Sequence, residues 1–412
     1  MTTLVDFPVK PEARPYLDAF AEDAGEPQWL RTVRRQGIDR FARTGFPSRR
    51  SENWRYLDLQ SLASEPLLPT SRAAQPALPA DLPPGIWLRP MRTAIAERPE
   101  LIRSLAAAAG TEAPLEALNA AFFADGFVLD VAAGIVVAEP IEIAHPAGTG
   151  DASLHTRSLV NLGAGSRVTI VETYGGSGKS NSGKYWRNDV AAWRLGEGAS
   201  LTRVALVEES AEAVSLSEVA AMLGADARLD GFLALFGGGT VRQEIAVAMT
   251  GDRAACRIDG AFVVSGSEEA NVVTAIDHRA VGGTTGELIK GVAAGRGHGA
   301  FQGKIVVREG AQQTDARQTS RNLILGRRAS IDTKPELEIL ADDVKCAHGA
   351  SVGELDEAAL FYLRSRGIPQ AEARRLLIEG FLREPIEGVA DPAIREHLLR
   401  RLSRRLARLE DQ

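Results

Sequence analysis

The sequence of 412 residues contains few cysteines, few aromatic residues and no long apolar run. Its two cysteines, Cys256 and Cys346, are too few for a disulfide framework. No apolar run approaches the ~20 residues that a membrane-spanning helix needs, and the first residues contain no apolar stretch typical of a secretion signal. These absences predict a soluble chain in the cytoplasm that does not enter a membrane.

An excess of basic residues is also absent. The formal net charge is −6, and because phosphate backbones are bound by basic surfaces, nucleic acid is not a predicted partner. Aromatic residues make up 6% of the chain, whereas there are 40 glycines. This balance favours thin layers and many tight turns over a thick aromatic core.

Common catalytic signatures are missing as well. We find no nucleophile elbow, HExxH, CxxC pair or EF-hand loop. The segment TYGGSGKS, from Thr173 to Ser180, resembles a phosphate-binding loop, but its first position is threonine and no helix pattern follows it. Such a loop needs a helix N-terminus to hold phosphate. We therefore interpret the segment as a hairpin loop between strands, and a stand-alone ATPase is the weaker hypothesis.

The first 125 residues predict helices interrupted by prolines. Leu30, Val33, Ile38 and Phe41 follow a helical stripe. Residues 66–90 contain seven prolines and are interpreted as an extended connection that does not pack. A second helical segment is predicted over residues 99–123.

From Gly126 to about His348 helical periodicity gives way to short β-prone runs separated by glycines. A degenerate motif recurs there, in which glycine precedes a small residue and then a β-type apolar residue. The small residues of this motif are Ser166, Ala199, Ala227, Ala255, Ala300 and Ala329, at spacings of 33, 28, 28, 45 and 29 residues. These spacings favour a β-solenoid with small residues inside its corners over the alternative, a glycine-rich sandwich. Cys256 is then expected to face the interior as a small hydrophobic residue.

The most informative segment runs from Asp332 to Ile368. It begins as a strand of alternating residues, predicted to be the last coil of the solenoid, and then becomes a helix over residues 357–366 that is capped by Asp356. Two further helices begin near Pro369 and Asp391. The last helix carries a row of arginines that we interpret as a solvated basic side.

Cys346 and His348 lie at the junction of this strand and helix. On a strand they share one face, about 6.6 Å apart at ~3.3 Å per residue. A thiolate and an imidazole suit iron, zinc or copper(I), and Asp342 or Asp343 could add oxygen. Two ligands do not close a metal site, so a packed cysteine beside a hydrogen-bonded histidine remains the favoured interpretation of the spacing alone. The other histidines are interpreted as surface or hydrogen-bonded side chains: His145, His155, His278, His298 and His397.

The stretch from Ser320 to Ile368 closely resembles the SufB/SufD family of scaffold proteins in the SUF system of iron–sulfur cluster assembly. Weaker likeness extends to GFPSRRSENWRYLDL at Gly45 and to the segment that begins at Ala124. The resemblance favours the D-type branch, because the B-type branch has a different tail around the Cys-Ala-His stretch and additional cysteines.

This resemblance implies a mainly β fold, with a right-handed parallel β-helix over residues 126–349 between an N-terminal helical region (1–125) and a C-terminal helical domain (350–412). It implies a scaffold that is not an enzyme, paired with a SufB-type subunit through the β-helix, and a homodimer is possible. His348 and its neighbour Cys346 match an interface position where transient iron or a nascent cluster would be held, with no cofactor bound stably by this chain alone.

The resemblance also implies that a SufC-type ABC ATPase docks on the C-terminal helices. The residues that fall in that region are Leu360, Phe361, Leu363, Leu376 and Phe381. A polysaccharide lyase or hydrolase built on a β-helix is the alternative function, and it would require paired carboxylates on one coil face together with export.

Overall fold

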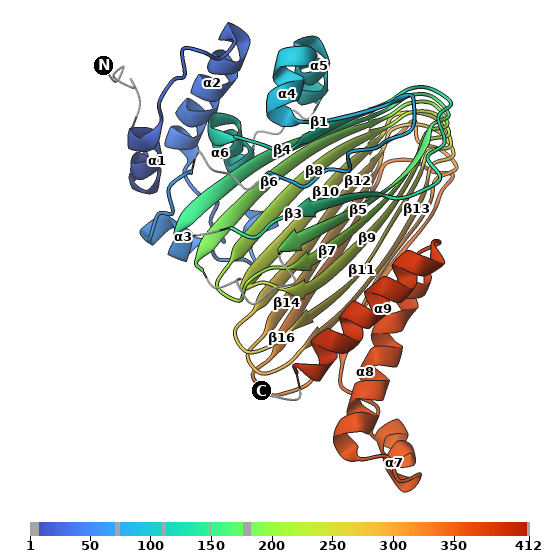
Figure 1. Ribbon diagram of the computed structural model, residues 1–412. Coiled ribbons are helices and arrows are strands. Elements are labelled where there is room, and N and C mark those ends of the chain that lie inside the picture. The colour runs from blue at the N-terminus through green and yellow to red at the C-terminus, as the bar shows by residue number, and fades with distance from the viewer. Residues whose placement is uncertain (1–7, 71–74, 109–112, 149, 176–182, 410–412) are drawn as a thin grey trace.

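The computed structural model describes residues 8–70, 75–108, 113–148, 150–175 and 183–409. Two facing β-sheets form a flattened solenoid, with helices at both ends of the chain lying outside it (Figure 1). From β2 onward, successive strands alternate between the sheets, so that each pair of strands is one coil. All strand pairs are parallel except β1 with β2. The predicted β-solenoid is therefore confirmed, and the sandwich is not observed.

The first sheet, here called sheet A, contains nine strands. In spatial order they are β1 (Ile86–Pro90), β2 (Phe127–Val131), β4 (Ala152–Leu162), β6 (Tyr185–Leu195), β8 (Val214–Leu223), β10 (Thr240–Met249), β12 (Glu269–His278), β14 (His298–Val307) and β16 (Ser330–Ile339). Sheet B contains eight strands. They are β3 (Ile141–His145), β5 (Arg167–Gly175), β7 (Ser200–Glu208), β9 (Arg228–Gly237), β11 (Ala255–Val264), β13 (Thr284–Ala293), β15 (Asp315–Ile324) and β17 (Lys345–Gly353).

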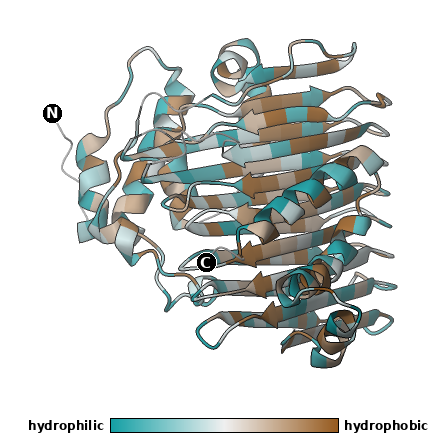
Figure 2. Cartoon of the chain, turned by 60° about the horizontal axis from the view of Figure 1, so that its bottom comes forward, coloured by the Kyte–Doolittle hydropathy of each residue, from teal (hydrophilic) through white to brown (hydrophobic). Residues whose placement is uncertain are grey.

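Stacking of equivalent positions builds the core. Thr240 pairs with Glu269, which pairs with His298, so that 29 residues make one coil in this region. Because side chains alternate along a strand, every second residue of each strand points between the sheets. Apolar residues occupy most of these positions along the whole stack, and Figure 2 shows hydrophobic residues, in brown, recurring along the stacked strands. One narrow core thus runs the length of the solenoid, and Cys256 lies in it as predicted.

Four of the six small residues of the repeat occupy solenoid corners, and two corrections are needed, at Ala255 and Ala300. Ser166, Ala199 and Ala227 are fully buried where sheet A passes to sheet B, and the next equivalent residue is Ala254, not Ala255. Ala329 lies at the opposite side of the coil, directly before β16, where sheet B passes to sheet A, whereas Ala300 lies within β14, just past the same kind of corner, and pairs with Asp332. The spacing of 45 residues therefore marks a change of corner, and no inserted coil is needed.

The N-terminal helices cover part of the outer face of sheet A. They are η1 (Pro11–Ala13), α1 (Arg14–Ala19), α2 (Gln28–Thr44), η2 (Glu52–Trp54), α3 (Gln60–Ser64), α4 (Met91–Glu97), α5 (Pro99–Ala108) and α6 (Pro114–Phe122). Ile38 and Phe41 of the predicted stripe pack in one cluster with Trp186 and Leu216 of the sheet. Asn119 of α6 donates hydrogen bonds of 2.8 Å to two backbone carbonyls of β4 and β6. The helical region is thus fixed on the first coils.

The proline-rich segment differs from its prediction. Its described part from residue 75 onward packs across the first coil, where Ala77 exchanges two backbone hydrogen bonds with Ala144. Leu78 and Leu82 lie against the core, and the segment ends in β1, which adds an antiparallel edge to sheet A. Proline is tolerated in such edge positions because no ladder hydrogen bond is lost. This segment closes the first coil.

Three helices follow the solenoid: α7 (Glu357–Ser365), α8 (Gln370–Glu387) and α9 (Pro392–Ala407). Asp356 and Asp391 accept hydrogen bonds from the first helical amides of α7 and α9, as predicted. Helices α8 and α9 pack on the outer face of sheet B, whereas α7 projects beyond it (Figure 1). Among the described residues, no helix combines the length and the apolar character needed to cross a bilayer.

The basic side of α9 is only partly solvated, contrary to the prediction. Arg405 is buried, where it forms an ion pair with Glu268 and donates to the carbonyl of Val263. Arg401 pairs with Glu208 in the same manner. These arginines attach α9 to the solenoid corners.

Candidate partner interface and metal half-site

The last coil leaves its strand edges uncovered. Strands β16 and β17 end their sheets, and no described strand pairs with the outer side of either one. Ile339, Leu340 and Val352 are large apolar residues that remain exposed there. We call this face, formed by β16 and β17, the open end. Exposed edges and apolar residues of this kind mark interaction surfaces.

Cys346 and His348 both lie at the open end. Cys346 pairs with Ala316 and His348 with Gln318, and those two residues of β15 are buried between the sheets. The two side chains therefore continue inward-facing positions, on one face of β17 as predicted. Cys346 is half-buried against the core, and this burial raises the pKa of its thiol. His348 is exposed because no further coil covers it.

The open end supplies an incomplete set of ligands. Among the described residues, no three histidine, cysteine, aspartate or glutamate side chains gather in the manner of a metal centre. Asp343 instead uses its backbone, which accepts from Gln313 and donates to the Gln312 side chain. Strand β17 also continues to Gly353, beyond the predicted end of the core. Cys346 and His348 are thus a possible half-site whose other ligands would have to come from outside.

The residues predicted to bind an ATPase divide into two groups. Phe361 and Leu376 are 72% and 44% exposed, respectively. Leu360 is only 4% exposed, so that it serves the packing of the helices. Leu363 and Phe381 are half-buried. Phe361 and Leu376 are therefore accessible to a partner, whereas Leu360 belongs to the core of the helices.

Tyr362 belongs to the same surface and was missed by the sequence reasoning. It is 57% exposed next to Phe361, and the Arg366 guanidinium lies 5.2 Å from its ring. Phe361 was predicted to bind the ATPase because of the family resemblance. Helical spacing relative to the buried Leu360 would have indicated that the rings of Phe361 and Tyr362 both face solvent.

Helix α8 is attached to the solenoid beside this surface. Lys290 of β13 is buried, forms an ion pair with Glu384 and donates a 2.9 Å hydrogen bond to the carbonyl oxygen of Phe381. Its ammonium group also lies 4.2 Å from the Phe381 ring centre. Displacement of α8 would therefore act directly on the strands near the open end.

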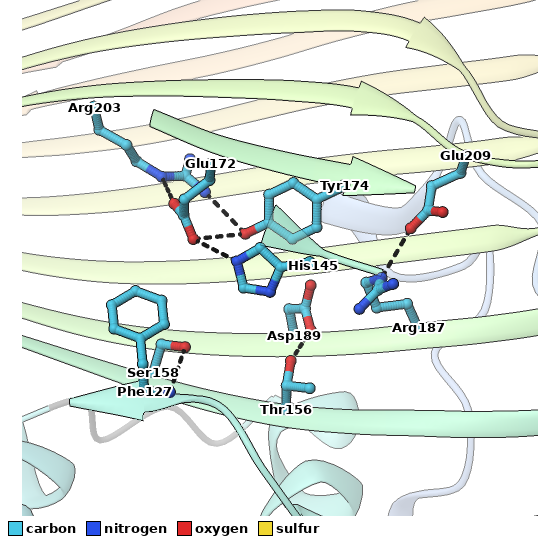
Figure 3. A network of polar contacts seen from close by, with 10 residues as sticks. All are labelled: Phe127, His145, Thr156, Ser158, Glu172, Tyr174, Arg187, Asp189, Arg203 and Glu209. Atoms are coloured by element: carbon cyan, nitrogen blue, oxygen red, sulfur yellow. Dashed lines mark hydrogen bonds and ion pairs between the residues drawn. The ribbon is translucent and has the colours of Figure 1, made fainter. Parts of the chain in front are cut away.

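A network of charged residues occupies the core at the other end of the solenoid (Figure 3). Glu172 accepts hydrogen bonds of 3.0 Å from Tyr174 and from His145, and it pairs with Arg203. All four residues are buried. Burial alone would raise the pKa of Glu172, but Arg203 and His145 lower it to about 2.

Arg187 extends this network toward the first corner. Its Nε donates a 2.8 Å hydrogen bond to Glu209, and Asp189 of the same strand accepts from Thr156 (Figure 3). Burial raises the pKa of Asp189 to about 6, although Arg187 opposes this effect. The network joins β3, β5 and β7 of sheet B with β4 and β6 of sheet A, so its chemistry is that of a structural crosslink.

The loop with the phosphate-binding pattern connects the same coils. Residues 176–182 lie outside the described residues, whereas Thr173 and Gly175 end β5. Strand β5 belongs to sheet B and the next strand, β6, to sheet A. These two strands do not pair with each other, so they form no hairpin, and the predicted loop itself lies outside the described residues.

These observations define the class of protein: a parallel β-solenoid that is closed at its first coil, open at its last coil and flanked by helices. Two family models match the chain. The model described as "SUF system FeS cluster assembly, SufBD core domain" matches residues 145–381, and that of the "SufBD protein N-terminal region" matches residues 70–143. The chain therefore belongs to the SufBD family of iron–sulfur cluster assembly proteins.

Relatives with curated names agree with this assignment. The chain is 27% identical to the iron–sulfur cluster assembly protein SufD of Escherichia coli, over 90% of this chain and 92% of that protein. It is 28% identical to SufD of Bacillus subtilis over 91% and 94% of the two chains. A SufBD family protein of Mycobacterium bovis is 31% identical over 57% of this chain and 59% of its own length. The family supports a role in iron–sulfur assembly over the alternative of a polysaccharide lyase or hydrolase.

Proposed function

We propose that this chain is a scaffold subunit without catalytic activity of its own, which pairs through its open end with a SufB-type subunit. The observation that carries this proposal is the last coil, whose edges and inward-facing positions at Cys346 and His348 are uncovered. An uncovered coil exposes backbone donors and acceptors together with apolar core, and a second solenoid would bury both. In β16, Pro335 lacks a backbone donor, which favours β17 as the edge that pairs.

Iron or a nascent cluster would be cargo at this interface. His348 offers a ring nitrogen and Cys346 a sulfur, the ligand types that suit iron. The raised pKa of Cys346 keeps its thiol protonated until metal displaces the proton. The remaining ligands would come from the partner subunit, so the isolated chain would hold no cluster stably.

The ATPase is proposed to dock on α7 and α8, as a separate SufC-type subunit. The exposed rings of Phe361 and Tyr362 beside Leu376 support this, because buried aromatic anchors dominate protein interfaces. Movement of α8 would reach the strands through Lys290 and Glu384. Nucleotide binding in the ATPase could thereby open the interface that holds Cys346 and His348. Cytoplasmic location stays a prediction from the sequence.

The first test is capture of the tagged chain from its own cell extract. We expect recovery of an ABC-type ATPase and of a cysteine-bearing paralogue. Recovery of a second copy of this chain at the open end, with neither of these proteins, would instead favour the homodimer and contradict the heteromeric scaffold.

The metal role is tested by His348→Ala in the co-expressed complex. We expect the complex to assemble but to form clusters at a rate at least about tenfold lower, measured by the visible absorbance of the cluster. The matched control is His298→Ala, since His298 lies on the outer face of sheet A and pairs with Asp332 at 2.9 Å. Equal cluster formation by both variants would refute the role of His348.

A further inference from the structure

A ladder of polar residues leads from His348 into the core. His348 pairs with Gln318 in β15, and Gln318 pairs with Glu287 in β13. Within this ladder the next residue inward is Ile258, so the polar run is confined to the last coils. The three polar side chains therefore occupy equivalent inward positions on adjacent strands, beginning at the open end.

Glu287 and Gln318 are buried, and each has an oxygen without a partner. Glu287 is 4% exposed and Gln318 is 1% exposed. The Nε2 of Gln318 donates a 2.6 Å hydrogen bond to Oε2 of Glu287. Oε1 of Glu287 and Oε1 of Gln318 have no hydrogen-bond partner among the described residues. Unpaired buried oxygens are costly, and each one calls for a ligand or an ordered water molecule.

The Glu287 carboxyl also lacks a counter-charge. Within the described ranges, no lysine or arginine forms an ion pair with it, whereas Glu172 at the other end pairs with Arg203. Burial raises the pKa of Glu287 to about 7, although Gln318 and the hydroxyl of Thr274 favour its ionised form. A cation at this position would supply the positive charge that the Glu287 carboxylate lacks.

Glycine at position 303 of sheet A allows the Gln318 side chain to lie close against β14. A Cβ atom there would lie closer to Nε2 of Gln318 and to the Phe301 ring than real contacts allow. Gly303 stacks on Thr274 of β12, so glycine and a small hydroxyl residue face the carboxyl and the amide. The arrangement combines a carboxylate, an amide oxygen and a hydroxyl on the strands next to the open end.

We propose that Glu287 and Gln318 form an inner cation site behind His348, which binds a divalent first-row transition-metal ion such as Fe²⁺ or Mn²⁺. Carboxylate and amide oxygens suit hard divalent ions such as Mn²⁺ better than soft ions such as copper(I). The inference deepens the proposed function, on which it rests: His348 would meet the ion at the surface, and the inner site would hold it within the chain itself.

The test uses Mn²⁺ and the purified full-length chain, with free Mn²⁺ measured by electron paramagnetic resonance. We expect Glu287→Gln, which preserves shape and removes charge, to weaken Mn²⁺ binding by at least about tenfold. Gly303→Ala should also weaken binding, because it displaces the Gln318 amide. His348→Ala should leave the equilibrium affinity of the inner site intact.

The matched control is Asp259→Asn in the adjacent strand β11. Asp259 is also buried, but it pairs with Arg257 and accepts from the Leu288 amide, on the outer face of sheet B. We expect this variant to bind Mn²⁺ as the unmodified chain does, and thermal unfolding would verify the fold of each variant.

Identical titrations for the unmodified chain and Glu287→Gln would overturn the inner site, as would loss of binding in His348→Ala alone. Either result would leave the proposed function standing, because that function is judged by cluster formation in the complex. If His348→Ala left cluster formation unchanged while Glu287→Gln lost Mn²⁺ binding, the inner site would stand and the metal role of His348 in the proposed function would be refuted.

Discussion

The two ends of the solenoid differ in how they treat their polar groups and their strand edges. At the closed end, which comprises the segment around Ala77, strand β1 and the first coils, Glu172 is paired with Arg203 and the edges are covered. At the open end, His348 is exposed and Glu287 has no counter-charge among the described residues. The closed end has its edges covered and its buried charges paired within one chain, whereas the open end has uncovered edges and buried polar atoms without partners among the described residues.

Buried residues of similar type therefore have different environments at the two ends: they are paired at the closed end and lack charged partners, among the described residues, at the open end. Buried charges that pair with each other hold coils together, and removal of one partner leaves the other without compensation. Charged or ligand-type groups that lack partners instead indicate a ligand or another chain. The ends can therefore be distinguished by matched substitutions.

The largest effect is expected from Arg203→Met at the closed end. It removes the arginine partner of the buried Glu172, which keeps only its hydrogen bonds from Tyr174 and His145. The free energy of unfolding should fall by about 3–5 kcal/mol, as measured by urea denaturation. Arg317→Met at the open end removes an exposed pair with Asp315 and should change that free energy by less than ~1 kcal/mol. Equal losses in the two variants would contradict the distinction between the ends.

The next effect concerns adjacent residues beyond the open end. Leu360→Ala should lower stability by about 2–5 kcal/mol, because it empties a buried position. Phe361→Ala should alter stability by less than ~0.5 kcal/mol but weaken binding of the ATPase by about 2 kcal/mol. Thermal unfolding and calorimetric titration with the ATPase measure the two quantities. An unchanged ATPase affinity in Phe361→Ala would show that docking occurs elsewhere.

A smaller effect, visible only in acid, is expected at His155 beneath the N-terminal helices. Burial lowers its pKa to about 3. In the unfolded chain the pKa of His155 is about 6.5. Below that pH the unfolded chain binds a proton at His155 that the folded chain does not bind, so stability falls as pH falls. His155→Gln removes this loss. Between about pH 7.5 and pH 5 the variant should lose about 2 kcal/mol less stability than the unmodified chain.

This comparison cancels the contributions of other groups, such as Asp189, that are present in both proteins. Urea denaturation at the two pH values supplies the four free energies. Parallel pH profiles would mean that His155 is protonated in the folded chain.

Local features of the structure followed from the sequence. The glycine-and-alanine repeat predicts the solenoid, because tight corners need small residues wherever they occur. The caps at Asp356 and Asp391 depend on residues only two or three positions away. Cys346 and His348 share a face because they are two residues apart on a strand.

Relations between coils did not follow from the sequence. Loop lengths that the repeat does not encode decide that Ala254, and not Ala255, occupies a corner. They also decide that the motif changes to the opposite corner before Ala300. The burial of Leu360 beside the exposed Phe361 depends on how α7 meets α8.

The sequence by itself therefore determined the architecture and the shared face of Cys346 and His348, since periodicity and capping are local. Only the tertiary structure showed that one end is closed and the other open. It alone placed Glu287 two strands behind His348, because residues about one coil apart become neighbours only when the stacking register is fixed.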